Sequence, residues 1–388
     1  MIRLKGGCLI TPYRMENGKD LYVDNEKICS CERTAEEDVQ EIDLNGLYVA
    51  PGFVDLHIHG GGGHEFWSED PREIKLAGKF HLEHGTTSVM PTVNYGTQLD
   101  YDAEKGKFEA YRNAVETDEN GPEYLGLHLE GPFVSPGQPM VPGQQVVPAV
   151  PEIYRRYLDD FPMIQRWTLA PEIPGTKKLA RELIDRGIYV SVGHSDADYN
   201  DVCDIFEIGA THATHLYSGM NMVHRVEGRR FPGVLESVFL LEDMYAEVIA
   251  NGAHLSGELL RLVYQQKGPG RVCVVSDATS MSGSPDGPVF YNGKMGIIDD
   301  GVILREDRSG FMGSAITYDR MLYNLIYRAG IPIQDAVRMC STTPARSVGM
   351  GTRKGVLAPG YDADIVVFDK DIKIKMVMAK GRIVYKNI

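Results

Sequence analysis

Eight apolar, β-rich runs follow one another along the middle of the chain, and each run stops at polar residues. The runs are YVAPGFVDLHIH, SVMPT, YLGLHLE, WTLAPE, IYVSVGHS, ATHATHLYS, AEVIANGAH and VCVVSDA. Stretches with helical periodicity separate them, such as TKKLARELIDRG and SGELLRLVYQQKG, and several end in glycine, as helix C-termini often do. Eight strand–helix units over about 290 residues match the size of a (β/α)₈ barrel. We therefore predict an α/β fold with a TIM barrel over residues 50–349.

The two ends of the chain have a different pattern. Residues 1–49 and 350–388 consist of short apolar runs separated by turn residues, for example Asn17-Gly18 near one end and ADIVVFD, IKMVMA and GRIVYK near the other. This pattern indicates strands joined by hairpins. Because such small sets of strands are marginally stable alone, we expect both ends to combine in one small β-sandwich domain.

Composition and charge restrict the classes of partner. With 43% hydrophobic and 24% charged residues, the chain has the composition of a folded globular protein. Its net charge of −14 disfavours nucleic acid and anionic membrane surfaces as partners. The opening MIRLKGGCLI leads into no cleavage site of small residues, and the chain has no apolar run long enough to cross a membrane. We expect a cytoplasmic protein that binds a small molecule, with local basic residues wherever that molecule is anionic.

The polar residues that end the apolar runs suggest a metal site. In a barrel the carboxyl ends of the strands meet at one face, so residues far apart in sequence converge there. His57 and His59 are two residues apart on one side of a strand, so both imidazoles can bind the same ion. An H-x-H pair alone is weak, since it is often just two polar residues on a strand. Further donors end later runs, namely Glu130, His194, His215 and Asp277. The alternative is a set of buried histidines and solvated carboxylates that hold no ion.

This donor set favours hydrolytic chemistry. Imidazole and carboxylate ligands without thiolate suit zinc, iron, manganese or cobalt, and we predict one or two divalent ions per chain. A bound ion lowers the pKa of water to about 7 and polarises the bond under attack, which is how amides are hydrolysed. Asp277, after the last run, is placed to take the proton of the water and return it to a leaving amine. Its alternative role is that of a hydrogen-bonded turn residue.

Two further segments are assigned structural roles. Five prolines between Ser135 and Pro151 exclude a helix or inner strand and predict a loop over the mouth of the barrel. His81 and His84 lie three apart in a helical stretch beside Lys79. We interpret this pair as part of a solvated helix face.

Six segments spread over nearly the whole chain carry a family resemblance: PGFVDLHIHG, LHLEGPF, SVGHS, THLYSGM, VSDA and FMGSAITYD. Together they resemble the N-acetylglucosamine-6-phosphate deacetylase family of the amidohydrolase superfamily. The resemblance implies hydrolysis of N-acetylglucosamine-6-phosphate to glucosamine-6-phosphate and acetate in amino-sugar catabolism, and a homodimer as the active form. It also implies a metal bound by Glu130, His194 and His215, with His57 and His59 available for a second ion that shares Glu130. Asp277 would then be the general acid and base.

The resemblance also assigns residues to the substrate. Arg230 in RRFPG is similar to the arginine that binds phosphate in this family, and a guanidinium suits that role because it donates two parallel hydrogen bonds. Arg229 and Arg230 are alternatively a solvated surface pair. His254 in NGAH is similar to a histidine that serves the substrate, and it is alternatively a strand-end residue capped by the backbone.

Several positions depart from the family pattern. Gln145 stands where many members have a histidine that polarises the substrate carbonyl, and Ser218-Gly219 replaces an Asn-Ala pair that contacts substrate. Phe231 replaces Glu, and Asn251 replaces Asp. The metal and acid–base residues match, so these departures leave the substrate open.

Two alternatives to the implied function are kept. One is an amidohydrolase with the same metal site that acts on N-acetylgalactosamine-6-phosphate, an unphosphorylated acetamido sugar or an N-acetyl amino acid. The other is a non-catalytic relative that binds metal. The intact ligand set together with Asp277 argues against the second alternative, because a chain that no longer catalyses has no need of the acid–base residue.

Overall fold

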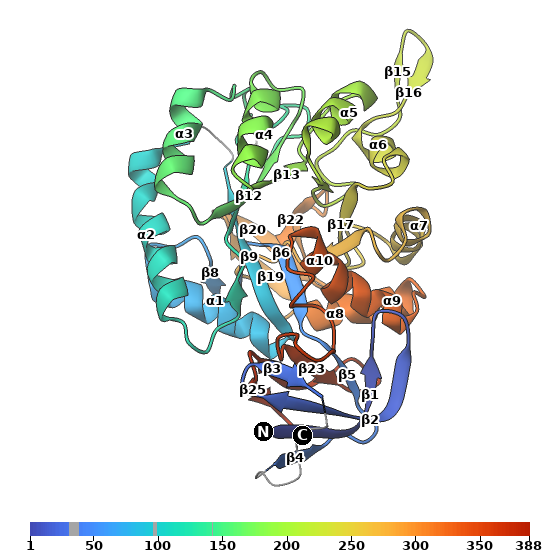
Figure 1. Ribbon diagram of the computed structural model, residues 1–388. Helices are drawn as coiled ribbons and strands as arrows, with labels where there is room; N and C mark the ends of the chain where they lie inside the picture. The colour runs from blue at the N-terminus through green and yellow to red at the C-terminus, as the bar shows by residue number, and fades with distance from the viewer. Residues whose placement is uncertain (31–38, 96–98, 142) are drawn as a thin grey trace.

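The protein is described by a computed structural model that covers residues 1–30, 39–95, 99–141 and 143–388, and Figure 1 shows a barrel with a β-sheet below it. The barrel strands are β6 (Phe53–Ile58), β9 (Thr86–Asn94), β11 (Leu127–Glu130), β12 (Ile164–Leu169), β13 (Tyr189–Val192), β14 (His212–Ala213), β17 (Tyr245–Ile249) and β18 (Val272–Val275). Neighbours in this series pair in parallel, and a parallel bridge from Ile58 to Ala278 joins the last strand to the first. Each predicted run supplies one barrel strand, so the predicted TIM barrel is confirmed.

Helices cover the outside of the barrel (Figure 1). They are α1 (Pro71–Glu83), α2 (Tyr101–Thr117), α3 (Pro151–Asp160), α4 (Thr176–Asp185), α5 (Tyr199–Ile208), α6 (Val234–Leu240), α7 (Gly257–Lys267), α8 (Tyr318–Tyr323), α9 (Ile333–Val337) and α10 (Thr343–Ser347). Two π-helical segments, Asn324–Arg328 and Arg338–Thr342, join the last three. The sequence sets the helix starts: Asp70 accepts a hydrogen bond from the Arg72 N–H at the start of α1, and Asp198 does the same for Asp201 at α5.

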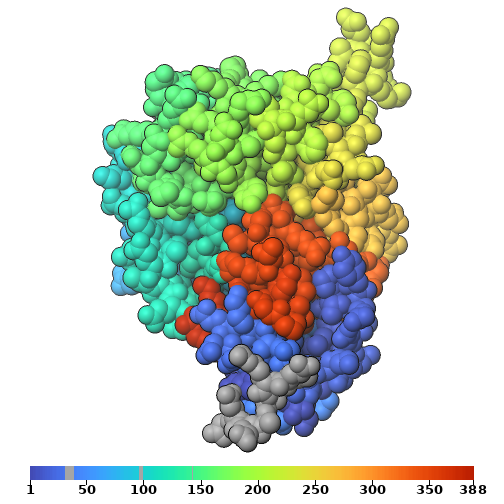
Figure 2. Space-filling view, viewed as in Figure 1, coloured from blue at the N-terminus to red at the C-terminus, as the bar shows by residue number. Residues whose placement is uncertain are grey.

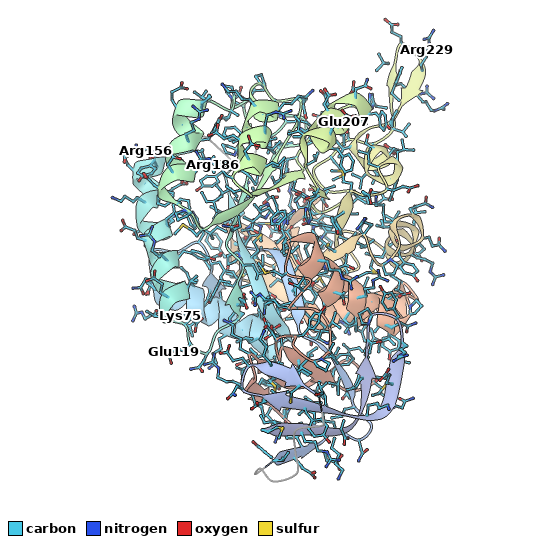
Figure 3. The ribbon with its side chains drawn as sticks, viewed as in Figure 1. Lys75, Glu119, Arg156, Arg186, Glu207 and Arg229 are labelled. Carbon is cyan, nitrogen blue, oxygen red and sulfur yellow. The ribbon has the colours of Figure 1, made fainter. Side chains whose placement is uncertain are left out.

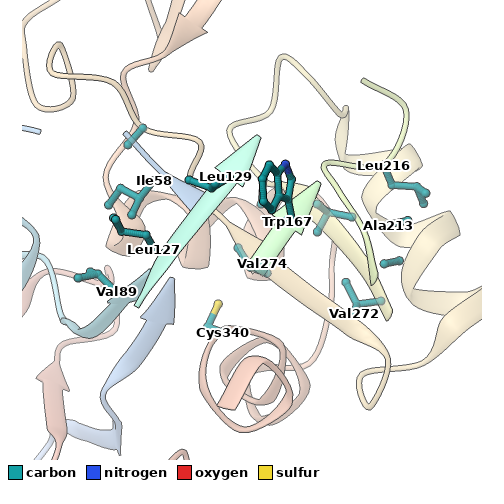
Figure 4. Packing of buried hydrophobic residues seen from close by; sticks show 14 of the residues in the cluster. Ile58, Val89, Leu127, Leu129, Trp167, Ala213, Leu216, Val272, Val274 and Cys340 are labelled. Carbon is teal, nitrogen blue, oxygen red and sulfur yellow. The ribbon is translucent and has the colours of Figure 1, made fainter. Parts of the chain in front are cut away.

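Apolar and polar side chains alternate along the barrel strands, so a hydrophobic core and a buried ion pair lie on opposite faces of the barrel wall. Leu127, Leu129 and Val274 pack together with Trp167 (Figure 4). Deeper in the barrel, the fully buried Arg166 pairs with Glu247 of β17. Arg166 also donates to the Leu56 carbonyl at 3.1 Å and to the Ser191 hydroxyl at 2.9 Å. These contacts link β6, β12, β13 and β17 beneath the face where the predicted site residues end their strands.

Strands from both ends of the chain form one mostly antiparallel sheet, which confirms the predicted β domain. They are β1 (Ile2–Ile10), β2 (Met15–Asp24), β3 (Lys27–Cys29), β4 (Gln40–Asp43), β5 (Tyr48–Pro51), β23 (Ile365–Phe368), β24 (Ile374–Ala379) and β25 (Arg382–Lys386). Their order is β25-β24-β23-β5-β1-β2-β3, and the sheet branches where β4 also pairs with β1. The division into residues 1–49, 50–349 and 350–388 stays a prediction. In the structure, β5 pairs with β1 and also with β23, where Pro51 is the last paired residue. The barrel starts at Phe53, the first residue of β6.

Three smaller sheets are inserted between elements of the barrel. The largest is antiparallel and follows β18; it contains β19 (Gly287–Tyr291), β20 (Lys294–Asp299), β21 (Val302–Arg305) and β22 (Phe311–Ser314). One hairpin joins β7 (Gly60–Gly61) to β8 (His64–Glu65), and a second joins β15 (His224–Val226) to β16 (Arg229–Phe231). The second hairpin projects from the body of the molecule (Figures 1 and 2). A short strand, β10 (Glu123–Tyr124), pairs with β9.

The structure agrees with the predicted proline-containing loop and disagrees with the predicted exposure of His81. The described part of the segment between Ser135 and Pro151 contains no helix or strand before α3, as predicted; Pro142 lies outside the described residues. The expected solvated histidine face is wrong for His81. This residue is fully buried in α1, and its Nε2 contacts the Gly60 carbonyl at 2.8 Å, because the β7–β8 hairpin covers that face of the helix. Every helix in the described ranges is too short or too polar to span a membrane.

Candidate active site

Six predicted site residues converge at the carboxyl ends of the barrel strands. His57 and His59 lie at the end of β6, Glu130 is the last residue of β11, and the other three follow their strands directly: His194, His215 and Asp277. These last three have positive φ values of 49°, 30° and 48°. A non-glycine residue in this region costs about 1–3 kcal/mol, so the surrounding fold holds all three in a conformation that the free chain disfavours. Such residues gather at functional sites.

Glu130 lies between two groups of histidines. Its Oε1 is 2.9 Å from Nε2 of His215 and 3.1 Å from Nε2 of His194. Its Oε2 is 3.4 Å from Nε2 of His57 and 3.8 Å from Nε2 of His59. The result is two triads of potential metal ligands that share one carboxylate. Within each triad the ligand atoms all lie within 4.8 Å of one another.

Backbone carbonyls set the tautomers of three of these histidines. The Nδ1 atoms of His59, His194 and His215 lie 3.0 to 3.1 Å from the carbonyl oxygens of Thr92, Gln138 and Ser218. A carbonyl only accepts, so each Nδ1 carries a proton, and each Nε2, which faces Glu130, is the nitrogen left to bind an ion. This is the arrangement in which imidazoles bind a metal, with the second nitrogen held by a hydrogen bond. The residues present therefore fit one or two divalent ions.

The charges of the site also fit a cation. Burial disfavours the protonated form of His59, but its contacts with Asp277 and Glu130 outweigh burial and raise the pKa to about 9. His215 has a pKa raised to about 9 in the same way, mainly through Glu130. Burial favours the neutral form of Asp277, yet the neighbouring His57 and His59 lower its pKa to about 2. The buried carboxylates thus require positive charge, which a divalent ion supplies when it displaces the imidazole protons.

Asp277 borders the triad of His57, His59 and Glu130. Its Oδ1 is 3.0 Å from Nε2 of His59 and 3.4 Å from Nε2 of His57. Its backbone N–H donates to the His57 carbonyl at 2.9 Å, which joins the last barrel strand to the first. The side chain remains 21% exposed, so the carboxylate is open to the cleft as well as to the imidazoles.

The site opens into a cleft with a polar inner part and a wider outer part. The inner part has a volume of about 530 Å³ and is lined by every proposed ligand residue except the buried His57, together with Trp67 and Asn94. The outer part, of about 1020 Å³, lies along the β19–β22 sheet. The two parts meet at Met140, Val141 and Tyr291, so the proline-containing loop and the inserted sheet form opposite walls of the entrance.

The residues assigned to the substrate are not all at the cleft. Ser218 lines the inner cleft. Gly219 packs against His194: its φ is +56°, and an added Cβ would lie 2.7 Å from Nδ1 of that ring. Gln145 is exposed, its amide donates to the Gly143 carbonyl, and it does not line the described cleft. Arg230 is exposed on the projecting hairpin.

His254 follows β17, is not among the residues that line the described cleft, and has a pKa that the charges of Asp277 and His215 affect. Its ring centroid is 4.4 Å from that of Phe311, which lines the outer cleft.

Sequence reasoning missed several contributors to the site. The carbonyls of Thr92 and Gln138 orient metal ligands, but any residue has a carbonyl, so residue type gave no signal. The Asn94 amide donates to Oε2 of Glu130 at 3.4 Å. Asn94 is the last residue of β9, two residues after the end of the apolar run SVMPT. Tyr291 and its sheet lie after the last of the eight apolar runs, inside the predicted barrel region but outside its strand–helix pattern.

An eight-stranded parallel barrel with two histidine–carboxylate triads at the carboxyl ends of its strands defines a class of metal-dependent hydrolases. Comparison with known proteins agrees with this class: the profile of the amidohydrolase family matches residues 48–384. The chain belongs to the amidohydrolase family.

Individual proteins that align with most of this chain show a more specific similarity than the family profile does. A Caenorhabditis elegans N-acetylglucosamine-6-phosphate deacetylase is 31% identical, with 99% of this chain and 93% of that protein covered. A crystal structure of the enzyme of that name from Pasteurella multocida is 29% identical, with a TM-score of 0.88 over 98% of this chain and 99% of the other. An N-acetylgalactosamine-6-phosphate deacetylase from Shewanella is also 29% identical, with 88% and 84% covered.

Proposed function

We propose that this protein hydrolyses N-acetylglucosamine-6-phosphate to glucosamine-6-phosphate and acetate, a step of amino-sugar catabolism. The observation that carries the proposal is the pair of triads sharing Glu130, with Asp277 beside them at the mouth of the barrel. Relatives that cover nearly the whole chain bear the name of this deacetylase, which supports the substrate class.

Each reacting group of the proposed mechanism comes from this cluster. Glu130, His194 and His215 would hold one divalent ion, and His57 and His59 with Glu130 a second; zinc is expected first, and iron, manganese or cobalt suit the same donors. When bound, such an ion polarises the acetamide carbonyl and lowers the pKa of a bound water. Asp277 takes a proton from the attacking water as the new C–O bond forms. It then returns the proton to the sugar nitrogen as the C–N bond breaks. With its pKa at about 2, Asp277 is ionised and able to act as the base.

Recognition of the phosphate is proposed to need a second copy of the chain. Arg230 lies on a hairpin that projects away from the body of its own subunit (Figure 2). The hairpin and the residues before it expose Met222, Val223, Val226 and Phe231, each between 42% and 52% exposed. Exposed apolar side chains gathered on one projection indicate a surface that a partner covers. We propose a homodimer in which Arg230 reaches the cleft of the other subunit.

Four further residues are proposed to contact the substrate. Ser218 and Gly219 adjoin the metal ligands and are proposed to face the acetamide. His254 is proposed to contact the sugar. Gln145 stays a predicted contact that requires the segment around Gly143 to move toward the cleft. The cytoplasmic location also stays a prediction from the sequence.

Steady-state acetate release by the metal-loaded protein tests the proposal. The substrates are N-acetylglucosamine-6-phosphate, its galactosamine epimer and the two unphosphorylated sugars, with an N-acetyl amino acid as a further arm. We expect the highest kcat/KM for N-acetylglucosamine-6-phosphate. A higher value for the epimer would move the assignment to the alternative that the Shewanella relative favours. No acetate from any substrate would leave only a metal-binding, non-catalytic role.

A further inference from the structure

The side chain of Asn251 has a fixed orientation at the carboxyl end of β17. This residue follows β17 and is 1% exposed. Its Oδ1 accepts hydrogen bonds from the backbone N–H of Ala253 at 3.1 Å and of His254 at 2.9 Å. A backbone N–H only donates, so the atom that faces these two groups has to be the amide oxygen. The amide nitrogen is therefore the atom that faces the His254 ring.

This orientation decides where His254 carries its proton. Nδ2 of Asn251 lies 2.8 Å from Nδ1 of His254. An amide NH₂ group only donates, so Nδ1 accepts this hydrogen bond through its lone pair. A neutral imidazole whose Nδ1 accepts carries its proton on Nε2. The tautomer is thus opposite to that of His59, His194 and His215, whose Nδ1 atoms donate to carbonyls.

The surroundings keep this ring uncharged and its Nε2 proton available. Burial is the main reason that the pKa of His254 is lowered to about 4; the charge of Asp277 opposes this and that of His215 adds to it. Within the described ranges, no residue forms a hydrogen bond with Nε2. One face of the ring contacts Phe311, a residue of the outer cleft.

We propose that Asn251 is a positioning residue that holds His254 as a neutral Nε2–H donor, and that His254 recognises an uncharged oxygen of the substrate, such as a sugar hydroxyl. This inference rests on the proposed function and sharpens it. Recognition of negative charge is then left to Arg230. An aspartate at this position, as in the D-G-x-H pattern that NGAH resembles, would accept a hydrogen bond from Nδ1–H and support an imidazolium.

The tautomer is tested directly by ¹⁵N NMR of histidine-labelled protein loaded with a diamagnetic divalent ion such as zinc. The His254 resonances are assigned from their loss in His254→Gln and in His254→Asn. At neutral pH we expect the pattern of a neutral ring with its proton on Nε2. Asn251→Asp should protonate Nδ1, whereas Asn292→Asp, which adds the same charge at the cleft wall, should leave the tautomer unchanged. A wild-type ring that is protonated on Nδ1 overturns the proposal.

The role in recognition is tested by comparing KM for the phosphorylated and unphosphorylated sugars. If His254 donates to an uncharged oxygen, His254→Ala should raise KM for both sugars by the same factor, about 3- to 10-fold. His254→Gln, which keeps an N–H donor, should recover part of this loss. Arg230→Ala provides the contrast, since it should affect only the phosphorylated sugar.

A His254→Ala effect confined to the phosphorylated sugar would show that the ring binds phosphate and would overturn the proposed role. The NMR result remains decisive for Asn251 even if no sugar is hydrolysed, so failure of this inference and failure of the proposed function are distinguishable.

Discussion

Single hydrogen bonds to backbone carbonyls orient three of the four histidines of the centre, and residue type does not reveal such contacts. The H-x-H pair, Glu130 and the histidines that end later runs could be chosen from the sequence, because strand ends in a barrel converge. The groups that orient them could not, since the Gln138 and Ser218 carbonyls belong to loops whose course no periodicity describes. Gln145 shows the reverse: a sequence position suggested a contact, and the loop holds the side chain at the surface.

Asp277→Asn should remove the base while leaving the ligand triads intact. An amide cannot take the proton of the attacking water, so we expect kcat to fall by roughly 10²–10⁴. Metal content, measured by elemental analysis of the same preparation, should stay near that of the wild type. A variant that turned over normally would show that the proton passes through another group.

Gly219→Ala should weaken metal binding through His194. The added methyl would lie 2.7 Å from Nδ1 of this ring and so displace the ligand or its hydrogen bond to Gln138. Loss of such an orienting contact typically costs about 10- to 100-fold in metal affinity. Gly228→Ala is the matched control, since Gly228 also has a positive φ, of +81°, but no atom lies within 4 Å of an added Cβ. Equal metal affinity in the two variants, from competition with a chelator, would show that the contact with His194 is unimportant.

At the scale of elements, the barrel strands and helices followed from apolar periodicity, and the insertions did not. The runs predicted all eight strands because buried parallel strands are nearly continuous apolar stretches. The β19–β22 sheet was missed because it lies outside the repeating strand–helix pattern and because its first strand has no buried side chain to produce an apolar run. The β15–β16 hairpin is short and exposed, so it carries little hydrophobic signal of its own.

The β15–β16 hairpin provides a prediction about phosphate. In the register of the hairpin Arg225 lies opposite Arg230, while Arg229 lies opposite Val226 and therefore points to the other face. Figure 3 shows Arg229 at the outer end of this hairpin. Arg230→Ala should raise KM for the 6-phosphate sugar by about 10- to 150-fold, the value of a charge-assisted contact. Arg229→Ala should have a much smaller effect. Equal effects of both variants would indicate general electrostatic attraction instead of a specific contact.

At the scale of the whole molecule, the metal centre links residues from the ends of five of the eight barrel strands. Removal of the ion with a chelator should abolish activity, because the carboxylates and imidazoles alone supply no activated water. It should also lower the melting temperature, since an ion that binds only the folded chain stabilises it. Calorimetry of loaded and chelated protein, with activity restored by added zinc, checks both effects. Full activity in thoroughly chelated protein would remove the metal from the mechanism.

The effect of chelation should grow with pH. In the metal-free centre His59 and His215 have pKa values raised from 6.5 to about 9, so their protonation stabilises the folded chain fully below pH 6.5. This stabilisation is lost as pH rises through about 9. Metal binding displaces the same protons and so becomes tighter over the same range. The difference in melting temperature between loaded and chelated protein should therefore widen from pH 6.5 to 9, and a constant difference would contradict these protonation states.

The strand order of the terminal sheet leaves part of it without a partner during protein synthesis. Strand β23 lies between β5 and β24, so the N-terminal strands have an open edge until β23 has left the ribosome. About 310 residues separate Pro51 from Ile365, a delay of roughly 15–60 s at ordinary translation rates. During that time β5 presents unpaired backbone groups beside apolar side chains, the kind of edge on which chains aggregate. The yield of soluble protein should thus depend on chaperones that bind the nascent N-terminal strands, more than on the stability of the finished fold.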